Sequence, residues 1–317
     1  MANAPYIVGV DIGGTKVACV LAEAGGRILA RQWQPTRSVE GWQAVVQQLF
    51  EMTEQVLEGV SFSQVRGIGI SCGGPLDSQR GIVYSPPNLP GWDAVPIKQL
   101  FEERFGLPTR LENDANATAL AEHRFGAGRG TRNMVFMTWG TGIGGGLILD
   151  GRLYRGTNDL AGEIGHTTVL LDGPLCGCGK RGCLESLASG PSIARRAREL
   201  ASESPESLVW QRVSPEEVTA QHVVEAAEAG DAFARFVLAE AATYMGIGIA
   251  NVAQILNPER VVLGTIAVKA GDLVLEPLRR ALAVHAWGRV REVLQVVPAE
   301  LGDRAQDLAA ICLWIED

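Results

Sequence analysis

Two glycine-rich chain reversals, each set between apolar stretches typical of β-strands, constrain the fold of this chain more than any other feature. The first is DIGGTK at residues 11–16, preceded by YIVGVD and followed by VACVLAE and RILARQW. The second is GTGIGGG at residues 140–146, preceded by MVFMTW and followed by LILD and RLYRG. Each set predicts an antiparallel three-stranded meander. Because the same architecture recurs about 125 residues later, we expect a duplicated unit and two lobes with a cleft between them.

Strands and helices alternate through the rest of the chain, which predicts the α/β class. The predicted helices are 40–58, 96–105, 113–126, 187–202, 215–229, 231–256, 268–284 and 303–316. The predicted strands are 65–71, 108–112, 259–265 and 292–301, and a Gly/Pro-rich loop occupies 72–92. The stretch 241–258 carries no charge but is interrupted by Gly, Asn and Gln, so we expect a buried helix there instead of a membrane span.

The charge balance argues against two classes of partner. With 36 acidic residues against 28 Lys and Arg, the net charge is −8, whereas nucleic acids and anionic membranes select basic surfaces. A small neutral or phosphorylated ligand is compatible with this balance. The N-terminal residues MANAPYIVGVD have neither a basic start nor an apolar stretch of signal-peptide length. We therefore expect a soluble, cytoplasmic protein.

The first reversal carries residues that suit phosphate binding. Paired glycines let backbone N–H groups approach phosphate oxygens, and an Asp at a strand end can hold Mg²⁺ through water. The candidates are Asp11, Gly13, Gly14, Thr15 and Lys16. An ordinary hairpin turn is the alternative interpretation. A P-loop or dinucleotide fingerprint is excluded, because these glycines lead into another strand and not into a helix.

The second reversal has five glycines in seven positions. Such a density costs conformational entropy and is hard to explain by packing alone. Its candidates for phosphate contact are Gly140, Thr141 and Gly142. Two phosphate-binding hairpins that face each other from two lobes would form an ATP cleft.

The triplet Glu112-Asn113-Asp114 lies between the two reversals, after a short predicted strand and before a predicted helix. Asp114 could simply be the helix N-cap, since Asn and Asp are common caps. Its place between the two turns favours another role, in which Asp114 takes the proton from an attacking hydroxyl and Asn113 holds a neighbouring sugar hydroxyl. With an ordinary pKa of about 4, Asp114 would be ionised at neutral pH.

A cluster of Cys and His residues follows the second meander: His166, Cys176, Cys178 and Cys183. Three thiols and one imidazole with glycine-rich spacers are typical of a closed, tetrahedral, structural zinc site. Glu163 and Glu185 flank the cluster and would remain available to bind hydroxyls. The other cysteines are isolated in apolar segments and should be small buried hydrophobic residues.

The motifs DIGGTK, END, GTGIGGG, GEIGH and CGCGKRGCLE span nearly the whole chain, and in this order they resemble the ROK family of bacterial sugar kinases and related repressors. The resemblance implies an actin-like ATPase (ribonuclease H-like) α/β fold, with a small lobe of residues 1–115 plus 303–317 and a larger, zinc-containing lobe of residues 116–302. It makes Asp114 the catalytic base and places Gly264, in VVLGT, near the adenosine. It assigns sugar binding to Gly73, Gly74, Asn88, Asn113, Asp114, Glu163, His166 and Glu185.

The reaction implied by the resemblance is transfer of the γ-phosphate of Mg·ATP to a hexose hydroxyl, most often the 6-OH. Glucose is the first choice from family frequency, and N-acetylmannosamine, N-acetylglucosamine, fructose and allose are the alternatives. The implied cofactors are ATP, Mg²⁺ and one structural Zn²⁺. The implied assembly is a homodimer or a higher homo-oligomer.

Three departures from the family pattern lie near the expected ligands. LGT at 263–265 replaces the usual LGG, SCGGPLD at 71–77 replaces the commoner PGPVD, and RGTNDLAGE at 155–163 replaces the usual Asn-Gly approach to the Glu. Two other functions are alternatives to a sugar kinase. A sugar-sensing repressor needs a DNA-binding helical module before the first phosphate strand, which here starts at residue 6. An actin-like chaperone or filament ATPase would not need Asn113, Asp114 and the zinc cluster.

Overall fold

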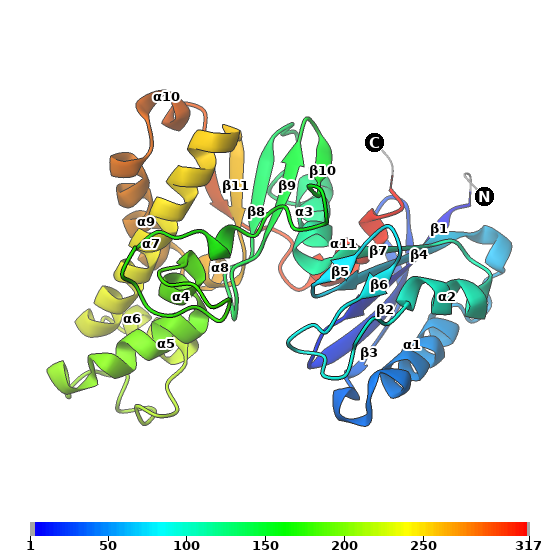
Figure 1. The fold of residues 1–317 in the computed structure, drawn as a ribbon, viewed down its shortest axis with the longest axis horizontal. Helices are drawn as coiled ribbons and strands as arrows, with labels where there is room; N and C mark the ends of the chain where they lie inside the picture. Colours follow the sequence, from blue (N-terminus) through cyan, green and yellow to red (C-terminus); the bar gives the residue numbers. More distant parts are fainter. Residues whose placement is uncertain (1–3, 316–317) are drawn as a thin grey trace.

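The computed structural model describes residues 4–315, and Figure 1 shows two lobes, each built around a five-stranded sheet. The strand order is β3-β2-β1-β4-β7 in the first lobe and β10-β9-β8-β11-β12 in the second. In each sheet, the first strand of the meander is central, with its antiparallel partners on one side and two parallel strands on the other. The two sheets therefore share one topology, as the repeated reversals predict.

The first sheet is covered on both faces by helices. Its strands are β1 (Tyr6–Ile12), β2 (Lys16–Glu23), β3 (Ile28–Pro35), β4 (Val65–Cys72) and β7 (Thr109–Asn113). One face packs on α1 (Trp42–Val56) and α2 (Ile97–Phe105), and the other packs on α3 (Asp114–Phe125) and α11 (Arg304–Cys312). Because strand side chains alternate, Val8 and Val10 belong to the core under α1, whereas Ile7 packs with Leu308 and Ile311 of α11.

Helix α11 lies unusually close to the first sheet. A Cβ atom built on Gly69 of β4 would lie 1.9 Å from Ala310 O, so only glycine permits this approach. The helix thus brings the end of the sequence onto strands from its beginning (Figure 1).

The second sheet has shorter strands and carries most of its helices on one face. Its strands are β8 (Met134–Met137), β9 (Gly145–Leu149), β10 (Arg152–Tyr154), β11 (Arg260–Leu263) and β12 (Gln295–Pro298). Val135 and Val261 point into a large core formed with α4 (Leu184–Ala188), α5 (Gly190–Glu199), α6 (Ala220–Glu228), α7 (Ala232–Leu256), α8 (Thr265–Ala270) and α9 (Asp272–His285). On the opposite face, Phe136 packs against Ala119 of α3.

Several predicted boundaries need correction. The helix expected at 187–202 is two helices, α4 and α5, and the helix expected at 268–284 is divided into α8 and α9 at Gly271, whose φ is +51°. The helix expected at 215–229 begins only at Ala220, where the Thr219 hydroxyl accepts a hydrogen bond from His222 N. The last helix, expected at 303–316, ends at Cys312, and residue 316 itself lies outside the described residues.

Short elements complete the fold. The loop 72–92 contains the two-stranded pair β5 (Leu76–Asp77) and β6 (Ile82–Val83). Helix α10 (Gly288–Arg291) was not predicted. The 3₁₀ turns are η1 (Ser38–Glu40), η2 (Phe62–Gln64), η3 (Ile164–His166) and η4 (Ala201–Glu203).

Helix α7 is long and apolar enough to span a membrane by length and composition, and it is the one such helix among residues 4–315. It packs instead against α9, α6 and α4 within the second lobe, and 61% of its most apolar window is buried. The prediction of a buried core helix is therefore confirmed.

The chain passes between the lobes through α3 and through the segment 299–303, which leads from β12 to α11. One buried carboxylate joins the two connections. Glu122 of α3 accepts hydrogen bonds from Ala127 N at 2.8 Å, Leu301 N at 3.0 Å and Glu300 N at 3.2 Å. Backbone donors of this kind bind a charged acceptor more strongly than a neutral one, so Glu122 fixes both connections to the same helix.

Candidate active site

The first glycine turn joins β1 to β2 at the cleft. Gly13 N donates to Lys16 O at 3.0 Å, and Thr36 Oγ1 donates to Gly13 O at 2.7 Å. Gly14 lies against Asn88, since a Cβ built on Gly14 would be 2.4 Å from Asn88 O. The turn is therefore closed by its own backbone and supported by the loop of Asn88, for which the family resemblance implies sugar binding. The side chains of Thr15 and Lys16 are exposed.

Two acidic side chains, Asp11 and Asp114, come together at the floor of the cleft. Burial raises the pKa of Asp11 to about 7, and the charge of Asp114 adds to this effect, while a hydrogen bond from Ser71 and the charge of Lys16 oppose it. The side chain of Asp114 is exposed to the cleft. Desolvation by the surrounding protein nevertheless raises the pKa of Asp114, and the hydrogen bond from Ala115 N opposes this rise only in part. The pKa of Asp114 is therefore higher than the ordinary value expected from the sequence, and the higher pKa makes the Asp114 carboxylate a stronger base.

The start of α3 fixes the direction of Asn113 and Asp114. Asn113 is the N-cap, because its Oδ1 accepts hydrogen bonds from Ala115 N at 3.0 Å and Asn116 N at 3.3 Å. The alternative in which Asp114 only caps the helix is therefore incorrect. With its oxygen used by the cap, Asn113 turns its Nδ2 toward Gly74, where a built Cβ would lie 3.3 Å away. The amide can donate, but not accept, at the loop that carries Gly73 and Gly74.

The second glycine turn is held by side chain and backbone together. Gly144 N donates to Thr138 Oγ1 at 2.7 Å, and Thr138 N donates to Gly144 O at 3.0 Å. Gly140 N donates to Gly142 O at 3.1 Å, while Gly140 O accepts from Gly190 N at 2.7 Å. The turn is thereby connected to the first residue of α5.

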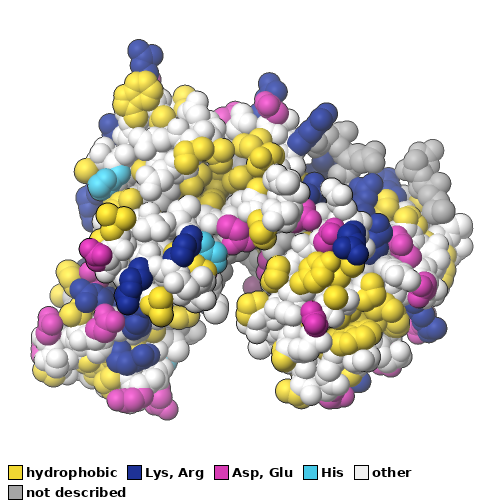
Figure 2. Space-filling view, viewed as in Figure 1, with side chains coloured by type: hydrophobic (Ala, Val, Ile, Leu, Met, Phe, Trp, Pro, Cys, Tyr) yellow, Lys and Arg dark blue, Asp and Glu magenta, His cyan; other side chains and the backbone are white. Residues whose placement is uncertain are grey.

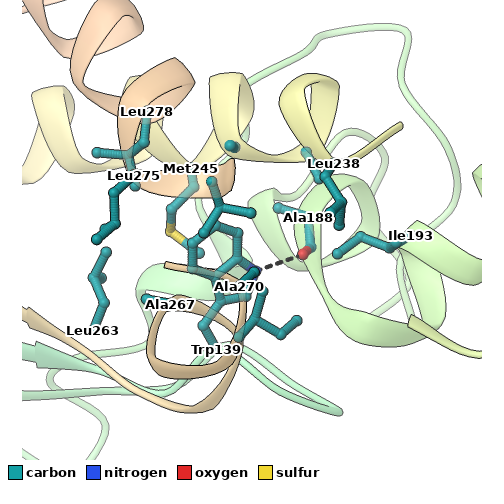
Figure 3. Packing of buried hydrophobic residues seen from close by; sticks show 14 of the residues in the cluster. Trp139, Ala188, Ile193, Leu238, Met245, Leu263, Ala267, Ala270, Leu275 and Leu278 are labelled. Carbon is teal, nitrogen blue, oxygen red and sulfur yellow. Dashed lines mark hydrogen bonds between the residues drawn. The ribbon is translucent and has the colours of Figure 1, made fainter. Parts of the chain in front are cut away.

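Trp139 anchors this second turn in the core of its lobe. The side chain is fully buried, and its Nε1 donates to Ala188 O at 2.7 Å, while Trp139 O accepts from Ile266 N at 2.8 Å. Figure 3 shows the indole among Met245, Ala267 and further aliphatic side chains of α7, α8 and α9. The position of Gly140 thus depends on a packed aromatic residue directly before it.

Packing explains part of the glycine density that the sequence assigned to phosphate binding. Gly145 and Gly146 belong to β9, and a Cβ on Gly146 would lie 2.5 Å from Ala119 Cβ of α3. Gly146 thus permits the close approach of α3 to the sheet. Gly145 permits the approach of another segment, because its Cβ would lie 2.8 Å from Gly162 O and from Ile164 Cδ1. For Gly145 and Gly146, the expectation that packing cannot explain the glycines is therefore wrong. Gly140, Thr141 and Gly142 remain the candidates for phosphate contact at the cleft.

The four predicted zinc ligands lie together. The donor atoms of His166, Cys176, Cys178 and Cys183 are all within 4.8 Å of one another. Cys178 Sγ lies 3.6 Å from Cys183 Sγ, and Cys176 Sγ lies 3.6 Å from His166 Nδ1. Tetrahedral Zn²⁺ with bonds of about 2.3 Å to sulfur needs sulfur atoms about 3.8 Å apart, so this donor set fits the ion. Cys19, Cys72 and Cys312 are buried and unpaired, as expected.

The two glutamates near the cluster have different partners. Glu163 Oε2 lies 3.8 Å from His166 Nε2, the ring nitrogen opposite the one beside Cys176. Glu185, in the first turn of α4, accepts a hydrogen bond at Oε2 from Ile143 N of the second glycine turn at 2.9 Å. Glu185 therefore connects the segment of the Cys and His cluster to the glycine turn, a contact that sequence spacing did not indicate.

Figure 2 shows the molecule hollowed between the lobes. A cavity of about 450 Å³ there is lined by Asp11, Gly13, Lys16 and Asp114 from the first lobe and by Thr138, Gly264 and Thr265 from the second. A second cavity of about 950 Å³ lies between Gly140, Thr141 and the helices α5, α6 and α8. Thr265 and Lys269 line both cavities. Sequence reasoning missed Lys269 as a cleft residue, because no motif marks it and only the direction of α8 brings it there.

Comparison with known proteins agrees with this arrangement. The family model described as "ROK family" matches residues 7–317. The chain belongs to the ROK family. Its duplicated sheets are the actin-like ATPase fold of that family.

Individual ROK relatives cover almost all of the chain. A glucokinase of Halalkalibacterium halodurans is 39% identical over 304 residues, which are 95% of this chain and 92% of the relative. The crystal structure of a ROK family glucokinase from Streptomyces griseus, in complex with glucose and AMPPNP, matches with a TM-score of 0.82 and 36% identity over 97% of this chain and 98% of that one. A xylose repressor of Caldicellulosiruptor bescii is 32% identical over 98% of this chain and 78% of the repressor.

Proposed function

We propose that this ROK protein is an ATP-dependent glucokinase that transfers the γ-phosphate of Mg·ATP to the 6-hydroxyl of glucose. The observation that carries the proposal is the Asp114 carboxylate, which begins α3, has a raised pKa and opens into the same cavity as Asp11 and the first glycine turn. Relatives named glucokinases support the choice of glucose. N-acetylmannosamine, N-acetylglucosamine, fructose and allose are the alternative acceptors.

ATP would lie along the two cavities that meet at Thr265. The larger one has the volume and apolar helix walls that suit a nucleoside. The triphosphate would extend past Gly264 toward the two glycine turns, where backbone N–H groups and Lys16 supply donors. Mg²⁺ fits the pair Asp11 and Asp114 as a hard cation for carboxylate oxygens, with Asp11 contacting it through water.

The sugar would lie beside the start of α3, against residues from both lobes. Asn113 donates from Nδ2, and the backbone at Gly73 and Gly74 with Asn88 completes the wall on the first lobe. Glu163, His166 and Glu185 supply acceptors and a ring N–H from the second lobe. Asp114 takes the hydroxyl proton as the sugar oxygen bonds to the γ-phosphorus and the bond to the β-phosphate oxygen breaks, releasing ADP.

One structural zinc ion would be held by His166, Cys176, Cys178 and Cys183. The ion would supply a fixed crosslink for a segment that has few apolar contacts of its own. With Nδ1 beside the thiols, the His166 ring is oriented so that Nε2 points toward Glu163. The cluster therefore positions two sugar-binding candidates without taking part in phosphate transfer.

The proposal extends to the assembly of the protein. We infer two lobes formed by residues 1–115 with 303–317 and by residues 116–302, a cytoplasmic location, and a homodimer or higher homo-oligomer. The packing of α11 on the first sheet supports this division of the chain. Light scattering coupled to size exclusion measures the oligomeric state, and a mass near 33.8 kDa would contradict the dimer.

The decisive experiment measures ADP release with and without each sugar of a hexose panel. We expect release that depends on sugar and is fastest with glucose. Release that is equal without sugar would favour an actin-like ATPase and contradict the kinase. Binding of xylose without any phosphorylation would favour the sugar-sensing role that the repressor relative suggests.

A further inference from the structure

A loop of the second lobe, residues 155–161, reaches across the cleft and contacts the first lobe. Ala161 N donates to Arg155 O at 3.1 Å, which closes the loop at its base. At its tip, the Asp159 carboxylate accepts two hydrogen bonds from Ser78, one from the backbone N at 2.8 Å and one from Oγ at 2.9 Å. Both oxygens of Asp159 are thus used by one residue of the opposite lobe.

Asp159 has a backbone conformation that most side chains avoid. Its φ is +61°, in the left-handed region where glycine is relaxed and Asp is tolerated at some cost. Glycine at this position would relieve the backbone but could not bond Ser78. The carboxylate forms two charge-assisted hydrogen bonds with Ser78, and these offset the free-energy cost of the backbone conformation.

The contact joins the two loops that carry the walls of the proposed sugar pocket. Ser78 follows Gly74 by four positions, through the short strand β5, and Asp159 precedes Glu163 by four positions. Movement of either loop would therefore change the distance between Gly74 and Glu163. Both residues are half-buried, so water competes only in part for their hydrogen bonds.

The base of the same loop supports the start of α3. Arg155 Nε lies 2.7 Å from Glu112 Oε2, and Glu112 is fully buried. Glu112 Oε1 in turn accepts from Asn113 N at 3.0 Å and from Asn116 Nδ2 at 2.9 Å. Residues 155–159 thus contact the first lobe at two points, Glu112 directly before Asn113 and Ser78 four positions after Gly74.

We propose that Asp159 is a positioning residue for sugar selection, which holds loop 155–161 on Ser78 and thereby sets the width of the hexose pocket. This inference rests on the proposed sugar kinase function. Asp159 touches neither the reacting atoms nor the phosphate turns. Its loss should therefore weaken sugar binding and hexose discrimination while leaving nucleotide binding and phosphate transfer at saturation largely intact.

The test is the variant Asp159→Gly, which removes the carboxylate and suits the positive φ, so that folding is not impaired. We expect KM for glucose to rise at least roughly tenfold, because the variant loses two hydrogen bonds to a charged group and the loss of one corresponds to about that factor. KM for ATP and kcat should stay within about twofold of the parent values, a range well below this factor. The ratio of kcat/KM for glucose over that for other hexoses should fall, and Asp159→Asn, which keeps one acceptor, should lie between.

A matched control is Asp150→Gly. Asp150 also has a positive φ, +50°, and belongs to the second lobe, but it is exposed in the β9–β10 turn and pairs with Arg132. It should leave KM for glucose unchanged. Ser78→Ala provides an independent variant in which one of the two hydrogen bonds is lost, and it should raise KM for glucose less than Asp159→Gly does.

The outcomes separate this inference from the function on which it rests. If the parent protein releases no ADP in response to any hexose, the kinase proposal fails. If the parent is active and both Asp159→Gly and Ser78→Ala keep its KM for glucose and its hexose preference, the positioning role is wrong. Glucose affinity measured by calorimetry without nucleotide should fall in parallel with the rise in KM, and an unchanged affinity would likewise contradict it.

Discussion

The two glycine turns occupy equivalent places in two sheets of the same topology, yet they are supported in different ways. The first turn is exposed, is followed by Thr15 and Lys16, and lies next to the coupled carboxylates Asp11 and Asp114. The second turn has no carboxylate of its own and is anchored by a buried tryptophan, Trp139, and by a hydrogen bond to Glu185. The first of the two duplicated turns thus differs in the charged carboxylates beside it, and the second differs in the packed side chains that fix its backbone.

The carboxylates with raised pKa values thus lie at the first turn, and the packed anchor lies at the second. Substitutions near the first turn should therefore change kcat and pH dependence. Substitutions near the second turn and the zinc cluster should change substrate affinity. The following predictions, in order of decreasing effect, test this division.

Asp114→Asn should have the largest effect. The amide retains a side-chain oxygen for Ala115 N but cannot accept the hydroxyl proton, so kcat should fall by about 10² to 10⁴, the range that general base catalysis contributes. Steady-state ADP release with saturating glucose and ATP measures it, and metal analysis should give the same zinc content as the parent. Retention of more than a tenth of the parent kcat would remove Asp114 as the base.

Asp11→Asn should change how stability depends on pH. Because burial raises the pKa of Asp11 from 3.8 to about 7, the folded state without metal binds this proton more tightly than the unfolded state does. The parent therefore loses stability from this group as pH rises from about 4 to 7. The variant cannot ionise, so its free energy of unfolding should exceed that of the parent at pH 8, by at most about 4 kcal/mol.

Denaturant titrations of nucleotide-free protein at several pH values measure this difference. Asp114→Asn should move the parent's loss of stability to lower pH, because the charge of Asp114 contributes to the raised pKa of Asp11. Parallel stability curves for the parent and Asp11→Asn from pH 4 to 8 would contradict the electrostatic picture of the first turn.

The same substitution in the two turns should have unequal effects. In Gly14→Ala the new Cβ would lie 2.4 Å from the backbone oxygen of Asn88, whereas in Gly140→Ala the nearest atom, Thr265 Oγ1, is at 3.8 Å. Gly14→Ala should therefore cost about 1 to 3 kcal/mol of stability, as overpacking does. The free energy of unfolding of Gly140→Ala should stay within about 0.5 kcal/mol of the parent value. Thermal unfolding measures both variants, and equal losses of stability in Gly14→Ala and Gly140→Ala would show that the two turns are supported alike.

Cys176→Ser should have the smallest effect on turnover. Loss of one thiolate weakens metal retention and frees the His166 ring, so KM for glucose should rise on the order of tenfold, as when support for a ligand-orienting group is lost. KM for ATP should not change, because the nucleotide cavity lies away from the cluster. The buried Cys312→Ser is a control for thiol removal elsewhere. Sugar affinity that is independent of zinc content would separate the cluster from the pocket.

Much of the fold follows from the sequence, because the alternation of apolar strands and amphipathic helices is local information. The two meanders, α1, α2, α3 and the long α7 are all visible in the periodicity, and the ligand set around His166 is visible in the spacing. The breaks at Ser189 and Gly271 were missed, because the flanking residues continue a helical pattern while the tertiary packing ends it.

The contacts that refine the site are long-range and leave no local signal. Gly146 reads as part of a phosphate turn, and only its contact with Ala119 shows that it serves helix packing. Likewise, nothing in the sequence pairs Arg155 with Glu112 or Asp159 with Ser78. Raised pKa values also depend on burial, which the sequence near Asp114 does not show.

The close packing of α11 on the first sheet has a consequence for biosynthesis. A ribosome releases β1, β2 and β4 long before it makes α11, so Ile7 and its neighbours on that face are covered only by α3 until residues 304–312 have been made. The first lobe is therefore completed only after the second lobe has been synthesised. A nascent chain, or one truncated before α11, exposes part of an apolar sheet face that chaperones recognise. The lobe that carries Asp11 can therefore complete its core only after α11 has been synthesised.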